Sequence, residues 1–424
     1  MGSMSDGELH DDMFDIEKEA ARSGSGVVDD PFPIWAKLLE QGPVHRGTVA
    51  ECMGLPVEQQ GLYIPGKEYF SVFGFGAISE VYTRKDDFGS EFYKEIGVTT
   101  MLGDNLLSMD GLRHRRYRDV IQEFFQPSHA GTWWRERVIS RLVDELVGRF
   151  EKGGSVDLNS QLCALLPMYT VTAAFGLSPQ EGIEFRHHIQ LGNDHDAPPE
   201  TRMAEFDKAI AIAENVIRQR QKEPRDDMIS KLAEVELVQE DGSRRKLTVR
   251  EICDFCRLIV FAGGGTTWRQ MGITLFCLLN DPEQLEAVRA DRSLISKAIL
   301  ESARWCPNDP MFPRKAIRDT ELAGTEIPQG AVLHLCLAAA NRDPSRWDNP
   351  DKFDVHRPVQ RSLAFAAGHH SCLGQHVSRE EMSAAINALL DRFSDIRWDP
   401  AQPAAKISGG LLARGPDRLP VLLN

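Results

Sequence analysis

One stretch constrains this chain more than any other: residues 365–376, which read FAAGHHSCLGQH. A cysteine kept only for packing is expected among bulky apolar side chains. Cys372 instead has small residues on both sides, with Ala366, Ala367 and Gly368 before it and Gly374 shortly after it. A helix is predicted to follow, over about 373–393. The pattern therefore indicates a thiol at the start of a helix, with room beside the sulfur for something large.

A thiol at a helix start faces free backbone N–H groups, and we expect these to lower its pKa and favour thiolate. A thiolate serves as a nucleophile, a redox group or a metal ligand. Nearby histidines could act as the base for a nucleophile: His369, His370 and His376. Zinc needs about four ligands, and His370 with Cys372 does not reach that number. A haem iron needs one axial thiolate and room for a flat macrocycle, which suits the small residues best.

Composition narrows the classes of partner. The 424 residues carry 49 basic and 63 acidic side chains, a net charge of −14, which argues against nucleic acid as the main partner. Eight cysteines are spread without a framework spacing, as in a reduced compartment. No stretch reads as a signal peptide or a membrane span, so we expect a cytoplasmic protein without a membrane anchor.

The periodicity of apolar residues predicts a mostly α-helical fold with minor β sheets. A helix of unusual length is predicted over 248–280, and the segment 63–78 reads as part of a small sheet. Residues 1–30 are predicted to be a flexible N-terminal segment. Because the motifs with chemical meaning are scattered from 114 to 372, we expect one interlaced domain over 31–424.

The loop from Phe365 to Gly374 has the pattern F-x-x-G-x-H-x-C-x-G, which resembles the haem-binding loop of the cytochromes P-450, the haem-thiolate monooxygenases. The resemblance covers about 32–424 and is of the soluble bacterial type. It implies the fold of that family, with haem b held between a long central helix and the cysteine loop. Cys372 would be the metal ligand, since a cysteine-ligated haem is the known arrangement of that family. The loop's other candidate cofactor-binding residues are Phe365, Gly368, His370 and Gly374.

Two further motifs resemble the family in the expected order. Glu301 and Arg304 of the stretch ESAR share a helix face, and with Arg357 they resemble the ion-pair network that braces the haem loop. In HRRYR, His114 and Arg118 also share a face, and with Arg314 and His370 they resemble the family's ligands of the haem propionates. The remaining arginines of that motif are expected to be exposed and to form a positive patch for an acidic electron-transfer partner: Arg113, Arg115 and Arg116.

The stretch FAGGGTTWRQ lies within the long predicted helix. Three consecutive glycines cost about 2–3 kcal/mol relative to alanine, which indicates close backbone approach or a local distortion. By resemblance this segment crosses the oxygen-binding face of the haem, with Ala262 beside the cofactor and Thr266 assisting proton delivery. The family's usual acid is replaced by Gly265, so water or another side chain must relay protons. The candidate catalytic residues are Thr266, Gly265 and Thr267.

The resemblance implies a monooxygenase that hydroxylates or epoxidises a hydrophobic small molecule with dioxygen. A ferredoxin and its NAD(P)H-dependent reductase would supply electrons, and we expect a monomer. Because of Gly265, a peroxygenase or isomerase stays open as an alternative. So do a haem protein that binds a ligand without turnover and, more remotely, a cysteine hydrolase without haem. The paired cysteines of CDFC, Cys253 and Cys256, are expected to pack rather than bind metal.

Overall fold

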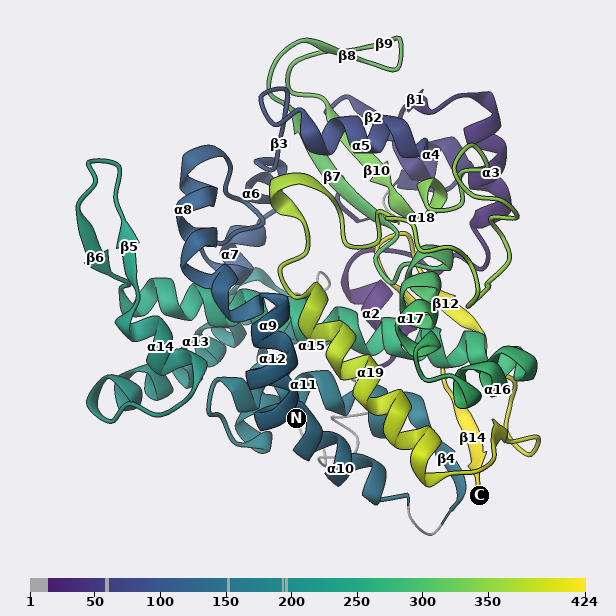
Figure 1. The fold of residues 1–424 in the computed structure, drawn as a ribbon. Coiled ribbons are helices and arrows are strands. Elements are labelled where there is room, and N and C mark those ends of the chain that lie inside the picture. The colour runs from purple at the N-terminus through teal and green to yellow at the C-terminus, as the bar shows by residue number, and fades with distance from the viewer. Residues whose placement is uncertain (1–13, 58–60, 151–152, 193, 195–196) are drawn as a thin grey trace.

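A long helix, α15 (Val249–Asn280), runs through the middle of the molecule (Figure 1). The computed structural model of the chain describes residues 14–57, 61–150, 153–192, 194 and 197–424. Helix α15 begins at a capping box. The Thr248 hydroxyl accepts a hydrogen bond from the Glu251 N–H at 3.2 Å, and the Glu251 carboxylate accepts one from the Thr248 N–H at 2.8 Å. The helix predicted over 248–280 is confirmed.

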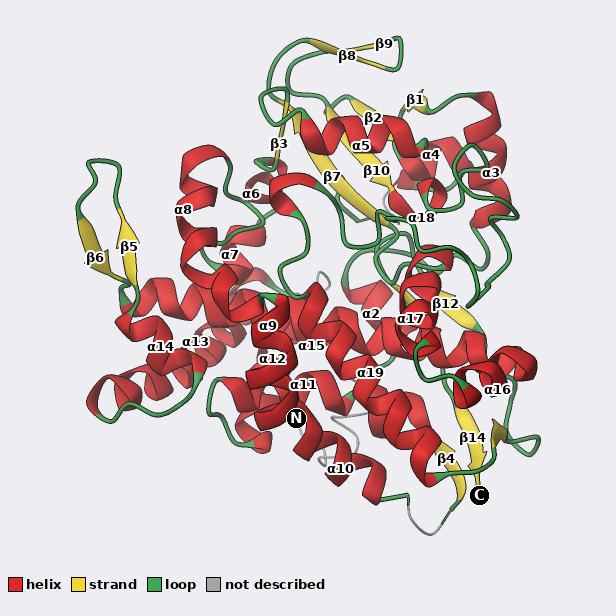
Figure 2. Cartoon of the chain, in the orientation of Figure 1, coloured by secondary structure: helices red, strands yellow, loops and turns green. Residues whose placement is uncertain are grey.

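Helices make up most of the described chain (Figure 2). Those before α15 are α2 (Ile16–Arg22), α3 (Phe32–Gln41), α4 (Val49–Met53), α5 (Phe75–Thr83), α6 (Phe92–Glu95), α7 (Val98–Leu102), α8 (Gly111–Ile121), α9 (Pro127–His129), α10 (Ser140–Gly148), α11 (Leu165–Ala174), α12 (Pro179–Gly192), α13 (Pro199–Lys222) and α14 (Met228–Glu234). Those after it are α16 (Pro282–Ala290), α17 (Leu294–Trp305), α18 (Leu337–Ala340) and α19 (Gln375–Arg392). A π-helical segment, Ala130–Ile139, leads into α10.

The strands form one sheet of five, one of three and three hairpins. The largest sheet has the order β1-β2-β10-β7-β3, and within it only β10 and β2 run parallel. Its strands are β1 (Val44–Arg46), β2 (Tyr69–Val72), β3 (Phe88–Gly89), β7 (Met311–Ala316) and β10 (Val332–Cys336). The others are β4 (Gly154–Asp157), β5 (Glu236–Val238), β6 (Arg244–Lys246), β8 (Thr320–Leu322), β9 (Thr325–Ile327), β11 (Ile396–Trp398), β12 (Ile407–Gly409), β13 (Arg414–Pro416) and β14 (Pro420–Leu423).

The two kinds of structure have separate cores. The larger core packs side chains of α10, α11, α15 and α19 together, among them Leu146, Leu166 and Ile386. A second core lies between the five-stranded sheet and α5 and includes Phe70 and Leu333. Figure 1 shows the five-stranded sheet at one end of the molecule and the helices around α15 at the other.

The predictions for local structure have different outcomes. The segment 63–78 contains strand β2, but its last residues, from Phe75 onward, begin helix α5 because Gly74 serves as a helix N-cap. Cys253 and Cys256 are buried in the helical core, which confirms that they pack. In the predicted flexible segment 1–30, residues 1–13 lie outside the described residues, and Ile16–Arg22 form α2. Neither the mobility of that segment nor the single domain over 31–424 is tested, and both stay predictions.

Candidate active site

Cys372 lies in a short loop between a 3₁₀ turn and helix α19. Its N–H donates to the carbonyl oxygen of Phe365 at 2.8 Å, which closes the loop on itself. Gly368 has a φ of +69°, and a Cβ there would lie 2.3 Å from the Tyr82 carbonyl oxygen, so only glycine fits. A Cβ on Gly374 would have no atom of the described residues within 4 Å. The loop is therefore pressed against the protein at Gly368 and has open space beside Gly374.

Burial raises the pKa of the Cys372 thiol. The backbone N–H groups of Gly374 and Gln375 and the Arg118 guanidinium act in the opposite direction, but they are outweighed. The prediction that the helix start leaves this thiol with a lowered pKa is therefore wrong for the chain alone, because desolvation of the charged form dominates. A thiolate here needs a bound cation, and coordination to a metal ion deprotonates a thiol outright.

The four basic side chains predicted to hold propionates meet near this loop: His114 and Arg118 from α8, Arg314 from β7, and His370 from the loop itself. The rings of His114 and His370 have their centroids 4.2 Å apart. Arg118 Nη2 donates to the Ser371 carbonyl oxygen at 2.8 Å, and the Arg314 guanidinium lies 5.1 Å from the centroid of the Tyr82 ring. The structure thus brings together side chains that are up to 256 positions apart in the sequence (114 to 370).

These histidines are held neutral. Burial lowers the pKa of His114 to about 3 and that of His370 to about 4. His370 Nε2 lies 3.3 Å from Asp110 Oδ1 and 3.1 Å from Ser90 Oγ, whereas His114 Nε2 is buried with no partner in the described part of the chain. Asp110 was not among the predicted residues, although its place directly before helix α8 was a signal for a cap. An unpaired buried nitrogen beside guanidinium groups suits an anionic ligand.

On the central helix, Ala262 and Thr266 lie one turn apart on one face, and Thr266 Oγ1 donates to the Ala262 carbonyl oxygen at 2.7 Å. Gly265 is buried, and a Cβ added to it would meet one described side chain, the Arg269 guanidinium, at 3.8 Å. Thr267 is turned by about 100° from Thr266 and is buried. The structure therefore does not bring Thr267 to the face that Thr266 occupies.

The neighbouring glycines allow close packing. A Cβ on Gly263 would lie 2.9 Å from Val171 Cγ2 of α11, and a Cβ on Gly264 would lie 2.8 Å from Arg186 Nη1 of α12. Val171 is β-branched and cannot move aside easily, whereas the Arg186 guanidinium is the end of a flexible side chain. Close approach of α11 therefore accounts for Gly263, as the helical cost of glycine suggested.

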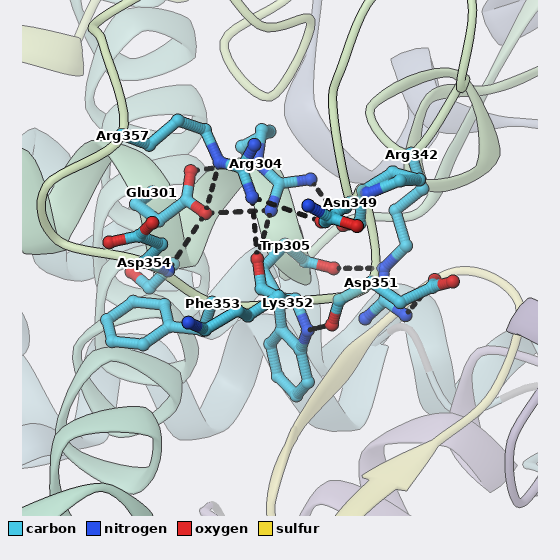
Figure 3. Close-up of polar contacts among 12 residues, drawn as sticks. Glu301, Arg304, Trp305, Arg342, Asn349, Asp351, Lys352, Phe353, Asp354 and Arg357 are labelled. Atoms are coloured by element: carbon cyan, nitrogen blue, oxygen red, sulfur yellow. Dashed lines mark hydrogen bonds and ion pairs between the residues drawn. The ribbon is translucent and has the colours of Figure 1, made fainter.

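The predicted ion-pair network is present (Figure 3). The Glu301 carboxylate accepts hydrogen bonds from Arg304 Nε and Nη2, both at 2.8 Å, and from Arg357 Nε at 2.9 Å. The remaining donors of the two arginines bind backbone carbonyl oxygens, including that of Lys352, which accepts from both. Glu301 and Arg304 are buried. This prediction from spacing and resemblance is confirmed.

The three other arginines of α8 each pair with an acidic side chain: Arg113 with Asp104, Arg115 with Asp119 and Arg116 with Glu240. The predicted positive patch is therefore partly neutralised, by Asp119 at i,i+4 on the same helix and by Asp104 and Glu240 from outside it. Arg115, at 78% side-chain exposure and 4.0 Å from its partner, is the least constrained of the three.

The family model described as Cytochrome P450 matches residues 197–408, which include the central helix, the ion-pair network and the cysteine loop. The chain belongs to the cytochrome P450 family. Membership implies haem bound through a cysteine thiolate. The chain is accordingly a P450 monooxygenase by family, as the motifs predicted.

Bacterial P450 enzymes are similar over most of the chain. The mycinamicin IV hydroxylase/epoxidase of Micromonospora griseorubida is 30% identical over 327 residues, covering 76% of this chain and 80% of the relative. The monooxygenase PikC of Streptomyces venezuelae is 29% identical over 406 residues, covering 94% and 92%. The crystal structure of HmtN, a hydroxylase of himastatin biosynthesis, superposes with a TM-score of 0.71 at 29% identity, covering 84% and 91%. These likenesses confirm the predicted P450 fold.

Within the part of the chain that the structure describes, no helix is both long enough and apolar enough to cross a membrane.

Proposed function

We propose that this P450 transfers one oxygen atom from dioxygen to a hydrophobic small molecule, by hydroxylation or epoxidation. For a hydroxylation the balance is RH + O₂ + 2e⁻ + 2H⁺ → ROH + H₂O. A ferredoxin-type partner with its NAD(P)H-dependent reductase supplies the electrons, and the enzyme works as a cytoplasmic monomer. The observation that carries the proposal is the meeting of basic side chains beside Cys372, within a chain of the P450 family.

The chain's own atoms suit a haem. His114 Nε2 is a buried nitrogen without a partner among the described residues, and a propionate oxygen would complete it. Arg118, Arg314 and His370 supply further donors for the two carboxylates. Phe365, Gly368 and Gly374 shape the loop, and the open space beside Gly374 leaves room for a flat ring. Ala262 presents a small side chain on the facing helix.

Once bound, the haem iron supplies the activation of dioxygen, while the chain controls charge and protons. Cys372 sulfur would ligate the iron, and coordination would deprotonate the thiol whose pKa burial raises. The N–H groups of Gly374 and Gln375 would then stabilise the thiolate. The Thr266 hydroxyl would hold and donate a proton, exchanging its bond to the Ala262 carbonyl for one to a water or a ligand.

The apolar character of the substrate is supported by an exposed aromatic side chain on the central helix. Phe261, directly before Ala262, keeps 39% of its surface exposed although it lies in the middle of α15. Two similar proteins are named as a hydroxylase/epoxidase of mycinamicin IV and a hydroxylase of himastatin biosynthesis, which supports hydroxylation or epoxidation as the reaction.

The test of the ligand is Cys372→Ala compared with Cys336→Ala, since Cys336 is buried in strand β10 away from the loop. We expect the first variant to lose the red-shifted Soret band of the reduced carbon monoxide complex that marks a thiolate ligand. The second variant should keep it. An unchanged band in Cys372→Ala would contradict the proposal.

A peroxygenase is the second candidate, and Gly265 is the observation that favours it. Without an acid at that position, proton delivery during dioxygen reduction is handicapped, whereas peroxide brings both electrons and protons with it. Product yield with hydrogen peroxide alone, compared with yield from a ferredoxin chain, separates the two. Product formed only with the ferredoxin chain would rule out the peroxygenase. NAD(P)H oxidation coupled to product formation would likewise rule out a haem protein that merely binds ligands.

A further inference from the structure

The N-terminal helix α2 is packed into the interior beside the central helix (Figure 1). Ile16 and Ala20 are buried, and the Phe14 ring meets the Trp268 ring of α15 edge-on, with centroids 5.8 Å apart. On the far side of α2, Ser408 of β12 donates to the Glu17 carboxylate at 2.7 Å. The helix is therefore held between α15 and the β12–β13 hairpin. These contacts bring residues 14–19 next to Trp268 and Arg269 of α15.

Glu19 is the charged residue of α2 that contacts the central helix. Its Oε1 accepts a hydrogen bond from Arg269 Nη1 at 2.5 Å. The other amino group, Arg269 Nη2, donates to Asp309 Oδ1 at 2.8 Å, and the Arg269 side chain is 5% exposed. Glu19 Oε2 is buried and has no hydrogen-bond partner in the described part of the chain. One carboxylate oxygen is thus fixed by the arginine, and the other keeps its hydrogen-bonding capacity unused within the described chain.

The Glu19 carboxylate binds the guanidinium that an acidic side chain at position 265 would reach. A Cβ on Gly265 would lie 3.8 Å from Arg269 Nη1, the nitrogen that donates to Glu19 Oε1. Positions 265 and 269 are also i and i+4 on one helix, the spacing at which such pairs form. Glu19 therefore supplies a carboxylate to the same arginine from elsewhere in the chain.

The cluster also lies on the face of α15 that carries Thr266. Residues 262, 266 and 269 follow the i, i+4, i+7 spacing of one helical stripe, so Arg269 is one turn beyond Thr266. Glu19 is therefore bound to a residue one turn from the threonine.

We propose that Glu19 supplies the distal carboxylate that position 265 lacks and relays protons toward Thr266. The inference rests on the proposed monooxygenase function. In that reaction two protons from solvent end in one molecule of water. Glu19 Oε2 takes up a proton from the solvent side and passes one toward the Thr266 hydroxyl, so the carboxylate is regenerated in each cycle. Arg269 holds the other oxygen throughout and keeps the group in position.

The first experiment compares Glu19→Gln with Glu17→Gln in the haem-loaded enzyme. Glu17 is a matched control, because it lies on the same helix and is exposed, with Ser408 and Lys406 as its partners. We expect Glu19→Gln to lower the fraction of electrons that reaches product by about tenfold or more, with hydrogen peroxide as the alternative product. The solvent deuterium isotope effect on product formation should rise in the same variant. Glu17→Gln should change neither quantity.

A rescue distinguishes a relay from a structural role. Gly265→Glu introduced into Glu19→Gln returns a carboxylate to Arg269 from a different backbone position, and it should restore coupling and the isotope effect. Glu19→Asp, which keeps the acid but shortens it, should retain part of the coupling and serves if the glutamine variant folds poorly. Coupling lost in Glu19→Gln and not recovered by Gly265→Glu would overturn the relay. Coupling lost in Asp309→Asn but kept in Glu19→Gln would assign the role to Asp309 instead.

A second readout does not depend on turnover. The C–O stretching frequency of the reduced carbon monoxide complex, compared in H₂O and D₂O, reports exchangeable donors near the distal ligand. Glu19→Gln should shift this frequency and reduce its sensitivity to D₂O, while Glu17→Gln should not. Identical spectra for wild type and Glu19→Gln would overturn the inference. If no redox partner yields product but the shift is seen, the monooxygenase proposal fails while the position of Glu19 is upheld.

Discussion

Two clusters of charged and polar side chains in this molecule differ in whether the polypeptide itself supplies their hydrogen-bond partners. In the first, Glu301 satisfies Arg304 and Arg357 directly, and backbone carbonyls take up their remaining donors (Figure 3). In the second, His114 has a buried nitrogen without a partner in the described chain, and Arg118 makes one hydrogen bond, to a backbone carbonyl. The first cluster is complete within the polypeptide. The second lacks hydrogen-bond acceptors within the described chain, so an anionic ligand is needed to stabilise it.

This difference separates residues that stabilise the fold from residues that retain a cofactor. Removing a member of the complete cluster is expected to harm the protein with or without haem. Removing a member of the incomplete cluster is expected to harm only the haem-loaded form, because the haem-free chain gains little from a buried, unpaired cation. Variants of the first cluster should therefore lower the free energy of unfolding even without haem. Variants of the second cluster should lower it only in the haem-loaded protein.

The largest effect is expected for Glu301→Gln. The substitution keeps the shape but leaves the buried Arg304 and the partly buried Arg357 without a counter-charge, which costs about 3–5 kcal/mol in the free energy of unfolding. Urea unfolding of the haem-free protein measures this loss. Glu286→Gln, which breaks an exposed i,i+3 pair with Arg289, is the control and should cost less than about 0.5 kcal/mol. Similar losses of unfolding free energy in the two variants would show that the Glu301 cluster contributes no more to stability than an ordinary surface ion pair.

Arg118→Met should show the reverse pattern. Burial lowers the pKa of Arg118, so its charge is already costly, and the haem-free protein should change by less than about 1 kcal/mol. Haem affinity should fall roughly 10- to 100-fold, the equivalent of about 1.5–3 kcal/mol for a charged hydrogen bond. The rate of haem transfer to excess apo-globin measures the affinity change. A large loss of unfolding free energy in the haem-free variant would show that Arg118 stabilises the fold itself.

The pH dependence of stability sharpens the comparison. The pKa values of His114 and His370 are lowered in the folded chain, so the unfolded chain binds protons first as the pH falls below about 6.5. The haem-free protein should therefore be most stable above pH ~6.5 and lose about 1–3 kcal/mol toward pH ~4. Bound propionates favour the protonated rings, so the haem-loaded protein should lose less. Equal losses in the two forms, measured as urea midpoints, would argue against contact between these rings and the propionates.

The smallest effect is expected for Arg115→Ala on the exposed face of α8. Because this side chain is 78% exposed and only loosely paired with Asp119, the free energy of unfolding should change by less than about 0.5 kcal/mol. Reduction by an acidic ferredoxin should slow modestly, and the slowing should disappear at high salt. Stopped-flow reduction at two ionic strengths tests this. A rate unaffected at low salt would place the electron donor on another surface.

Sequence reasoning succeeded where a feature depends on neighbours a few positions away. The central helix and the pairing of Glu301 with Arg304 both follow from spacings of three or four residues. The grouping of His114 with His370 could not be read from spacing and came from resemblance alone. The acid partner of Arg113 lies nine positions away outside the helix, and no local rule predicts it.

The failures arose where burial or distant contacts decide the outcome. The thiol of Cys372 was expected to have a lowered pKa from its helix start, but the surrounding protein raises it, and sequence does not reveal the extent of desolvation. Glu19 is not among the residues predicted from the sequence, because it lies in a polar N-terminal stretch. Its position beside Arg269 depends on a contact across 250 residues.

The segment between α18 and the cysteine loop, residues 341–367, contains neither helix nor strand. Its shape is set largely by the two arginines bound to Glu301, which donate to the main-chain oxygens of Asn341, Asp348, Asn349, Pro350 and Lys352. Every amino acid offers such an oxygen. Evolution can therefore rewrite the side chains along this connection while its path, and the approach to the thiol, stay the same.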